Sequence, residues 1–379
     1  MRSFYDSIFF NVPHLRFPEF TEEWETKPIN DLAVVIGGGT PDTTVKSYWD
    51  GEIQWFTPSE IGKTKYVDSS LRTITEDGLN NSSAKRLPPN TILLSSRATI
   101  GECSLSLREC ATNQGFQSLV SKKCNVDFLY YLIQTKKNDL IRKSCGSTFL
   151  EISANEVRKI QVSIPSDVEQ QKIAGLLSLI DERIATQNKI IERLETLIKG
   201  IRNEIFWKLR KNVGFNAIIG DVLDYEPPQS YIVEDTEYID KGTPVLTANK
   251  AFILGYTSET EGIYDKGDCI IFDDFTLDSK YVDFPFKVKS SAIKILTAEN
   301  KELLRYTFEF LKYLDLSTSE HKRHYIAETQ NQEFILPTTQ IVRTIAHTFS
   351  ILSLRMETAI KQRLLFEKQK QYLLRQMFI

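Results

Sequence analysis

The sequence predicts a mixed α/β protein with an internal pseudo-two-fold repeat, in which two similar globular units are separated by two long antiparallel coiled-coil helices. Three observations predict this fold class. A long central stretch has the apolar spacing of a coiled coil, and the same stretch returns at the end of the chain. The segments before each copy consist mainly of short strand-like runs separated by turn-forming residues.

The first helix is predicted from apolar residues that recur at alternating steps of three and four. They are Leu177, Ile180, Ile184, Ile191, Leu194, Ile198, Ile201 and Ile205, and Gln187 is the one polar member of the series. A repeat of 3.5 residues keeps one face apolar only when two helices wind together, so this seam indicates a paired helix. A helix of about 38 residues would be about 57 Å long, which favours a spacer over a core helix. A surface helix lying on its own domain is the alternative.

The second helix is predicted because the stretch recurs without a gap. Aligning Pro165 with Pro337 gives an offset of 172 (337 minus 165), which holds as far as Phe206 and Phe378. Identical pairs along it include Ile173 and Ile345, Ala174 and Ala346, Ser178 and Ser350, Arg183 and Arg355, Thr186 and Thr358, Lys189 and Lys361, and Glu195 and Glu367. Leu352, Met356 and Phe366 are the predicted pairing positions of this second copy.

A weaker sequence similarity lies upstream of each helix. Residues 29–32 resemble residues 219–222 at an offset of 190 (219 minus 29). The repeated helix and this upstream similarity together predict four segments. They are a first globule over 1–164, a central spacer helix over 165–210, a second globule over 211–336 and a C-terminal spacer helix over 337–379. Since a duplication fixes the architecture, every local motif is interpreted within this frame.

Within the globules, short β-branched and aromatic runs between Gly, Pro, Asn and Ser clusters predict strands. In the first globule these are residues 53–56, 91–95, 103–107 and 116–120, and in the second they are residues 243–246, 269–272 and 286–288. Helical periodicity predicts helices over 128–143 and 301–314. Residues 29–40 read as a short strand or helix broken by three glycines.

The amino-acid composition and net charge limit the classes of protein to which this chain could belong. A chain of 379 residues with 41% hydrophobic residues has room for two cores. It has no run of about 18 apolar residues and no recognisable signal peptide, so we expect no membrane span and a cytoplasmic protein. Five cysteines without a CxxC pair argue against a disulfide framework. The net charge of −3 means that any nucleic-acid binding must come from local basic patches.

The sequence offers no convincing catalytic or metal site. Thr57 stands where a P-loop needs its first glycine, and the glycines at 37–39 are followed by Pro41 and no helix. The acids Asp273, Asp274 and Asp278 with Lys280 are interpreted as a turn rather than a nuclease centre. His321 and His324, beside Lys322 and Arg323, are interpreted as a solvated or phosphate-facing patch rather than metal ligands. The chain therefore reads as a binding protein.

Several motifs resemble one family. They are Leu15-Arg-Phe-Pro-Glu-Phe20 with Trp24, Ile53-Gln-Trp-Phe-Thr-Pro58, Ser95-Ser-Arg-Ala-Thr-Ile-Gly101, Thr112-Asn-Gln-Gly-Phe116 and Glu169-Gln-Gln-Lys-Ile-Ala174 after Ile164-Pro165. In the second globule they are Thr247-Ala-Asn-Lys250, Ile253-Leu-Gly-Tyr256, Ile271-Phe-Asp-Asp-Phe-Thr276 and Tyr281-Val-Asp-Phe284. Over essentially the whole chain, the sequence resembles the DNA-specificity (S) subunits of Type I restriction-modification enzymes.

This resemblance implies that each globule is a target-recognition domain for one half of a bipartite, asymmetric double-stranded DNA site. It implies that the helices dock methyltransferase (M) subunits, two copies being expected, and that motor and nuclease (R) subunits complete the complex. It also implies that this chain is not an enzyme and binds no cofactor, since S-adenosylmethionine, ATP and Mg would belong to the partners. The second copy departs from the pattern, because Glu169 becomes Ile341 and seam positions Ile191 and Ile198 become Arg363 and Lys370. A coiled-coil scaffold and an autonomous DNA-modifying enzyme are the alternatives.

Candidate DNA contacts follow from side-chain chemistry. Arg97, Asn113 and Gln114 carry the donors that read guanine and adenine edges, although the two amides could instead satisfy turn backbone. The cations suited to phosphates are Lys63, Lys65, Lys250, Lys322 and Arg323. The seam residues Leu177, Ile180, Ile184, Ile191, Leu194, Ile198, Leu352, Met356 and Phe366 are the candidates for helix pairing and partner binding.

Overall fold

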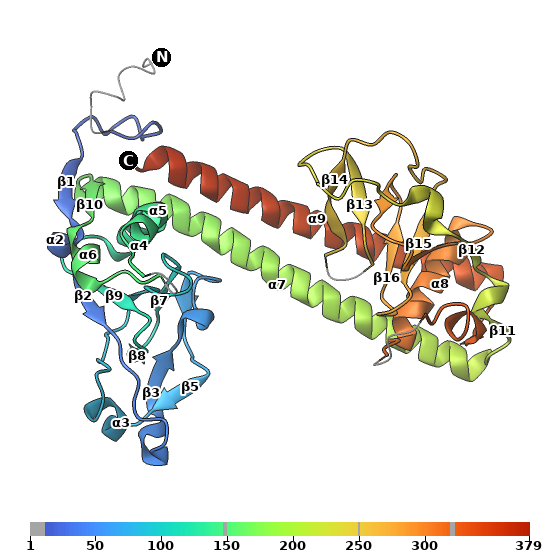
Figure 1. Cartoon of the computed structure of the whole chain (residues 1–379), viewed down its shortest axis with the longest axis horizontal. Coiled ribbons are helices and arrows are strands. Elements are labelled where there is room, and N and C mark those ends of the chain that lie inside the picture. The colour runs from blue at the N-terminus through green and yellow to red at the C-terminus, as the bar shows by residue number, and fades with distance from the viewer. Residues whose placement is uncertain (1–11, 147–149, 249–250, 319–322) are drawn as a thin grey trace. The chain divides into compact units, whose positions relative to one another are not determined.

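The computed structural model describes residues 12–146, 150–248, 251–318 and 323–379. They form two compact units (Figure 1). Unit 1 comprises Met1–Lys189 with Lys361–Ile379, and unit 2 comprises Ile190–Ile360. Each unit therefore contains one globule together with a segment of each long helix.

Unit 1 contains two main sheets and a separate strand pair. The larger sheet has the strand order β2-β9-β6-β7-β4, formed by Ala33–Gly37, Gln117–Ser121, Ile92–Leu94, Cys103–Ser106 and Tyr66–Val67. The smaller has the order β5-β3-β8, formed by Arg72–Ile74, Trp49–Phe56 and Cys110–Thr112, and the pair joins β1 (Glu25–Pro28) to β10 (Gln161–Ile164). The short helices are α2 (Ile29–Leu32), α3 (Glu76–Asn80), α4 (Val126–Thr135), α5 (Lys137–Arg142) and α6 (Ala154–Lys159).

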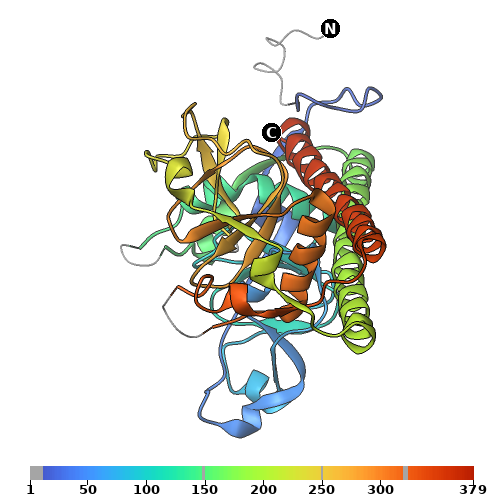
Figure 2. The same cartoon turned by 90° about the vertical axis from the view of Figure 1, so that its right-hand side faces the viewer.

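Unit 2 has the same plan with fewer strands. Its larger sheet has the order β12-β18-β15-β16, formed by Asp224–Glu226, Ile293–Thr297, Cys269–Asp273 and Ser279–Val282. The smaller has the order β14-β13-β17, formed by Ile253–Thr257, Thr243–Leu246 and Lys287–Val288, and the separate pair joins β11 (Ala217–Ile218) to β19 (Glu333–Phe334). Helix α8 (Lys301–Leu314) lies between the larger sheet and the long helices (Figure 2).

The strand pairing shows that the repeat extends through both globules. In each small sheet the middle strand, β3 or β13, pairs antiparallel with one neighbour and parallel with the other. Pro28 pairs with Gln161, and Ile218 pairs with Glu333, which are the same positions shifted by the two sequence offsets of 190 and 172. The two units are therefore copies of one topology, and the predicted fold class is confirmed.

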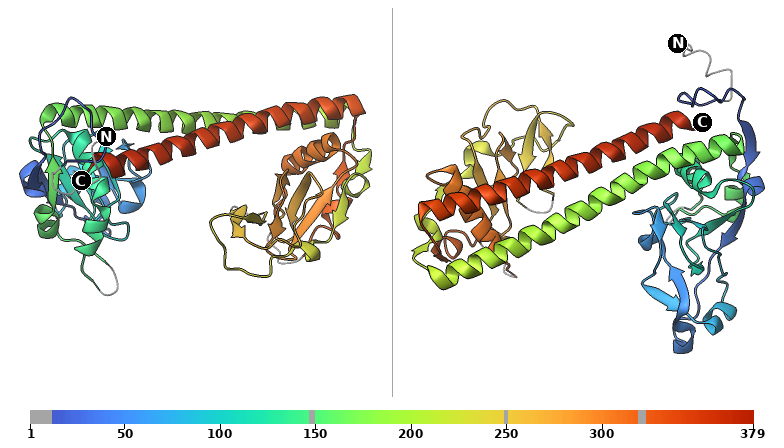
Figure 3. Two further views of the ribbon diagram at one scale, coloured as in Figure 1. Left: turned by 90° about the horizontal axis from the view of Figure 1, so that it is seen from above. Right: turned by 180° about the vertical axis from the view of Figure 1, so that it is seen from behind.

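The two long helices begin at equivalent positions. Helix α7 spans Asp167–Asn212 and α9 spans Thr339–Met377, so their first residues are again 172 apart (339 minus 167). Figure 3 shows the two helices side by side and antiparallel within each unit. In unit 1 the Nζ of Lys370 lies 2.8 Å from an Asp181 carboxylate oxygen, and in unit 2 the Arg202 guanidinium lies 5.7 Å from the ring of Phe349.

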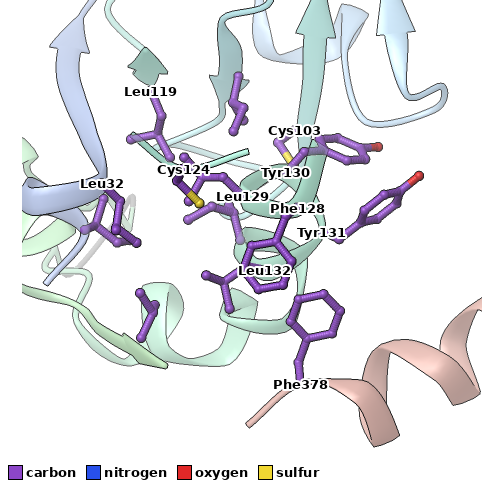
Figure 4. Packing of buried hydrophobic residues seen from close by; sticks show 14 of the residues in the cluster. Leu32, Cys103, Leu119, Cys124, Phe128, Leu129, Tyr130, Tyr131, Leu132 and Phe378 are labelled. Atoms are coloured by element: carbon purple, nitrogen blue, oxygen red, sulfur yellow. The ribbon is translucent and has the colours of Figure 1, made fainter. Parts of the chain in front are cut away.

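The ends of the helices are part of the globule cores. In unit 1 the ring of Phe378 stacks on Phe128 of α4 at 5.3 Å (Figure 4). It also meets Trp24 edge-on at 6.3 Å. In unit 2 the equivalent residue, Phe206, packs on Tyr306 and Phe310 of α8. These fully or nearly buried rings fix each helix end against its globule by hydrophobic packing.

Most predicted elements are present, with two differences. The helix predicted over 128–143 is two helices, α4 and α5, which meet at Lys136. The Nζ of Lys136 donates to the Ile379 carbonyl oxygen at 2.6 Å, a tertiary contact that helical periodicity does not encode. The segment left open as strand or helix contains both, since α2 is followed directly by β2.

Candidate nucleic-acid interface

A cluster of polar loops lies at one end of the larger sheet of unit 1. The backbone N–H of Ser96, just after β6, donates to the Gly115 carbonyl oxygen at 2.8 Å, and Ile152 N–H donates to the Ser96 carbonyl oxygen at 3.1 Å. Three segments of the chain, carrying Arg97, Gln114 and Glu151, are therefore held together. The structure thus brings together the base readers predicted in unit 1.

Arg97 has a carboxylate partner that the sequence did not indicate. Its Nε lies 2.9 Å from Glu151 Oε1, and both side chains are partly exposed. The ion pair fixes the guanidinium at the surface, although a nucleic-acid base would have to compete with Glu151 for it. A partly exposed pair of this kind is worth little to stability, so such competition is feasible.

Asn113 and Gln114 occupy the turn between β8 and β9. The Asn113 side-chain oxygen accepts from Gly115 N–H at 2.8 Å, so this amide satisfies turn backbone, as the structural alternative expected. Gln114 is exposed, and its side-chain oxygen accepts from the Thr40 hydroxyl at 2.5 Å, which leaves its NH₂ group as the outward donor. Of the two amides, Gln114 is the more exposed, and it stays a predicted base contact.

Lys63 and Lys65 lie on one loop but have opposite environments. Lys63 is exposed. The side chain of Lys65 is only 6% exposed, its Nζ lies 2.6 Å from Asp127 and donates to the Ser178 hydroxyl of α7 at 2.7 Å, and it faces the Tyr131 ring at 4.9 Å. The prediction that Lys65 contacts phosphate is wrong, because this side chain is committed to the interior.

In unit 2, the acids interpreted as a turn do form one. The Asp273 carboxylate accepts from the N–H groups of Phe275 and Thr276 at 2.9 and 3.0 Å, and Asp274 is buried 3.1 Å from Lys294 Nζ. Among the described residues there is no group of three or more His, Cys, Asp and Glu side chains that could hold a metal ion. The loop is thus braced by its own acids.

The predicted basic patch of unit 2 is described only in part. Arg323 is exposed and donates to the Ser291 hydroxyl at 3.4 Å, whereas Lys250, His321 and Lys322 lie outside the described residues. His324 is buried, with its Nδ1 2.8 Å from Glu328, so the prediction of a solvated or phosphate-facing His324 is wrong. Its backbone N–H donates to the buried Asp274 carboxylate at 3.0 Å.

The predicted seam residues are used within the chain. Leu177 and Ile180 are buried in the core of unit 1, with Ile184 and Phe366 packed against them. Leu352 is buried in unit 2, where Ile198 packs on the same core. Ile191, Leu194 and Met356 are half-buried. Helix pairing and globule docking therefore occupy most of this surface.

A different apolar stripe faces outward on each long helix, which sequence reasoning missed. On α7 it comprises Val168, Leu179, Ile190 and Leu197, and on α9 it comprises Ile351, Leu354, Leu365 and Tyr372. Steps of 3, 7 or 11 residues keep the members of each series on one side of a helix. Exposed apolar stripes with this spacing are typical of helices that bind other helices.

Four of the five thiols are buried and are not activated as nucleophiles. Burial raises the pKa of Cys103, Cys110, Cys124 and Cys269 to about 12, so these groups stay protonated at neutral pH.

Among the described helices, none combines the length and apolar content needed to cross a membrane.

These features define a class of protein: a tandem repeat of one α/β unit, with a polar loop cluster on each copy and paired helices carrying exposed apolar stripes. Comparison with known proteins agrees with this class. Residues 21–196 match the family described as "Type I restriction modification DNA specificity domain". The match covers the globule of unit 1 and the first part of α7.

Two relatives illustrate the match. The sequence is 36% identical over 218 residues to the MjaIX specificity subunit of Methanocaldococcus jannaschii, covering 56% of this chain and 50% of the relative. It is 42% identical over 151 residues to the EcoR124I/EcoR124II specificity subunit of Escherichia coli, covering 38% of this chain and 35% of the relative. The matches therefore span half or less of these relatives.

Two solved structures resemble this protein in fold over nearly the whole chain. An S subunit of a Type I restriction-modification system from M. genitalium superposes with a TM-score of 0.65 at 16% identity, covering 97% of this chain and 99% of that one. A structure from work on complex assembly and conformational transition of the type I R-M system gives a TM-score of 0.52 at 14% identity, covering 96% and 98%. At this identity the likeness concerns the fold alone.

Proposed function

We propose that the chain is the DNA-specificity subunit of a Type I restriction-modification complex, and that each unit reads one half of a bipartite, asymmetric DNA site. The observation that carries the proposal is the repetition of one topology with one loop cluster but different loop side chains. Copies of a scaffold that present different donors to DNA read different sequences, because base edges are distinguished by hydrogen-bond pattern.

The partners follow from the same proposal. Two methyltransferase subunits dock on the exposed apolar stripes of α7 and α9, and motor and nuclease subunits join the full complex. S-adenosylmethionine, ATP and Mg belong to those partners, so this chain contributes recognition without catalysis. Such a complex works on DNA in the cytoplasm.

The experiment that tests the proposal uses the full chain purified with its methyltransferase partner. Incubation with S-adenosylmethionine and a DNA library, followed by mapping of methylated adenines, should return one motif with two different halves separated by a fixed gap. The isolated chain should transfer no methyl group. Methylation by this chain alone would favour an autonomous enzyme, and binding of the partner without any sequence motif would favour a scaffold.

A further inference from the structure

The internal repeat makes two segments equivalent, and these two segments differ in charge. At the helix offset of 172, Glu151 corresponds to Arg323 (323 minus 151) and Ile152 to His324. The backbone confirms this correspondence. Ile152 N–H donates to the Ser96 carbonyl oxygen at 3.1 Å, and His324 N–H donates to the Asp274 carbonyl oxygen at 3.2 Å. The two segments thus occupy the same place, beside the loop that follows β6 in unit 1 and β15 in unit 2.

The arginine of the loop cluster lies on a different segment of the chain in each unit. In unit 1 the residue after Ser96 is Arg97, and Glu151 pairs with it at 2.9 Å. In unit 2 the residue after Asp274 is Phe275, and the position of Glu151 is taken by Arg323. Among the described residues of unit 2, no carboxylate forms an ion pair with Arg323. Within the described part of unit 2, the guanidinium is retained in the loop cluster without the carboxylate that pairs with Arg97 in unit 1.

The backbone that follows Arg323 is held by buried contacts at His324 and Tyr325. The buried Asp274 carboxylate accepts from His324 N–H at 3.0 Å and from Tyr325 N–H at 2.8 Å, and its other oxygen lies 3.1 Å from Lys294 Nζ. The buried Tyr325 ring packs on Phe272 at 5.4 Å. A donor placed on such a braced backbone loses little backbone conformational entropy when it binds.

A second cation lies on the facing loop. Lys289 is exposed, and its N–H donates to the Leu246 carbonyl oxygen at 3.1 Å, as Asn113 N–H donates to the Phe56 carbonyl oxygen at 3.1 Å in unit 1. Lys289 is therefore the counterpart of Asn113. Two residues further on, the Ser291 hydroxyl accepts from Arg323 at 3.4 Å, so both cations belong to one loop cluster.

We propose that Arg323, which the sequence alone assigned to a phosphate, reads a guanine edge in the half-site of unit 2 and that Lys289 contacts a phosphate beside it. The inference rests on the proposed DNA-reading function and identifies residues for it. Arg323 is assigned to the base because a planar guanidinium binds guanine O6 and N7 bidentately and its backbone is fixed. Lys289 is assigned to the phosphate because a flexible ammonium acts as a point charge without sequence preference.

The test compares three variants of the full chain, each assembled with its methyltransferase partner on the same DNA library. Arg323→Ala and Arg323→Lys should both relax one position of one half-site, lowering the preference for guanine there by roughly 5- to 150-fold. Arg323→Lys keeps the charge, so methylation of the relaxed sites should persist. Lys289→Ala should weaken all sequences alike and reduce the salt dependence of binding.

The half-site of unit 1 is an internal control, since an unchanged unit 1 half-site shows that the complex has folded and assembled. If Arg323→Ala leaves the whole motif unchanged, or if it weakens all sequences alike and Arg323→Lys restores binding, the guanine assignment is overturned while the proposed function stands. If the wild-type complex yields no bipartite motif, the proposed function itself has failed.

Discussion

At the residue scale, neighbouring side chains of the same type have different roles because burial differs. Lys63 and Lys65 are two residues apart, yet Lys63 is exposed while Lys65 is paired with Asp127 and bonded to Ser178. A buried ammonium needs compensating partners, whereas an exposed one remains available to a phosphate.

We predict that Lys63→Ala weakens DNA binding of the assembled complex for all sequences and lowers the slope of log affinity against log salt by about 1. Lys65→Ala should leave that slope unchanged and lower the free energy of unfolding instead, because Asp127 and Ser178 lose their partner. Titrations at several salt concentrations and urea unfolding curves distinguish the two. Equal salt slopes for Lys63→Ala and wild type would contradict the phosphate assignment.

A second residue-scale prediction concerns Glu169, which is buried and accepts two 2.7 Å hydrogen bonds from Arg16. Glu169→Ala should destabilise the chain by about 3 to 5 kcal/mol, because it leaves Arg16 charged and unpaired in a largely buried position. The equivalent residue of the second helix is Ile341, so α9 begins without a carboxylate at this position. The double variant Arg16→Met, Glu169→Ile should therefore recover most of the loss in urea unfolding.

At the element scale, each long helix has a buried side and an exposed side with different tasks. The buried side ends in the equivalent rings Phe206 and Phe378, each packed in a globule core. The exposed side carries the apolar stripes, including Leu179 and Ile351, which the repeat also makes equivalent.

We predict that Phe378→Ala costs about 3 to 5 kcal/mol of unfolding free energy, since it leaves a cavity beside Phe128 and Trp24. Leu365→Ala on the same helix, with a side chain that is 68% exposed, is the matched control and should change stability by less than about 0.5 kcal/mol. A similar loss for both variants in chemical denaturation would show that α9 is not anchored by its terminal ring.

The exposed stripes give a further prediction. Leu179→Arg and Ile351→Arg should each fold normally and each reduce the number of methyltransferase copies bound, because a charge in an apolar docking surface is costly to desolvate. The double variant should bind none. Native mass measurement of the co-purified complex gives the stoichiometry, and two bound copies on the double variant would rule out this docking surface.

At the scale of the whole molecule, the paired helices offer a ruler for the gap between half-sites. Four residues inserted between Ala185 and Thr186 add about 6 Å of helix and a rotation of about 40° relative to whole turns. We expect a gap longer by one or two base pairs, with both half-site sequences unchanged. Methylation mapping decides the matter, and an unchanged gap in an active complex would refute the ruler.

A control insertion follows from the structure, because α7 and α9 pair within each unit. Inserting four residues in α7 alone also shifts it relative to α9, whereas matching insertions in both helices preserve the pairing on either side. The matched variant should therefore retain more stability in urea unfolding while showing the same change of gap. Altered half-site sequences in either variant would mean that the globules are not independent readers.

Much of the fold was determined by the sequence itself. The offsets of 172 and 190 predicted two units, and both reappear in the strand registers and in the first residues of α7 and α9. Helix α8 and strand β13 begin and end where periodicity and composition predicted. These features are local, because heptad spacing and turn residues act through neighbours along the chain.

Tertiary structure alone decided the use of individual side chains. It buried Lys65 and His324, gave Arg97 a partner 54 residues away (151 minus 97), and placed Arg323 where the other unit has Glu151. It also separated the paired seam of each helix from its exposed stripe. Charge compensation and burial depend on contacts between segments distant in the sequence, so a single-chain pattern predicts which donors exist but not which remain free to bind DNA.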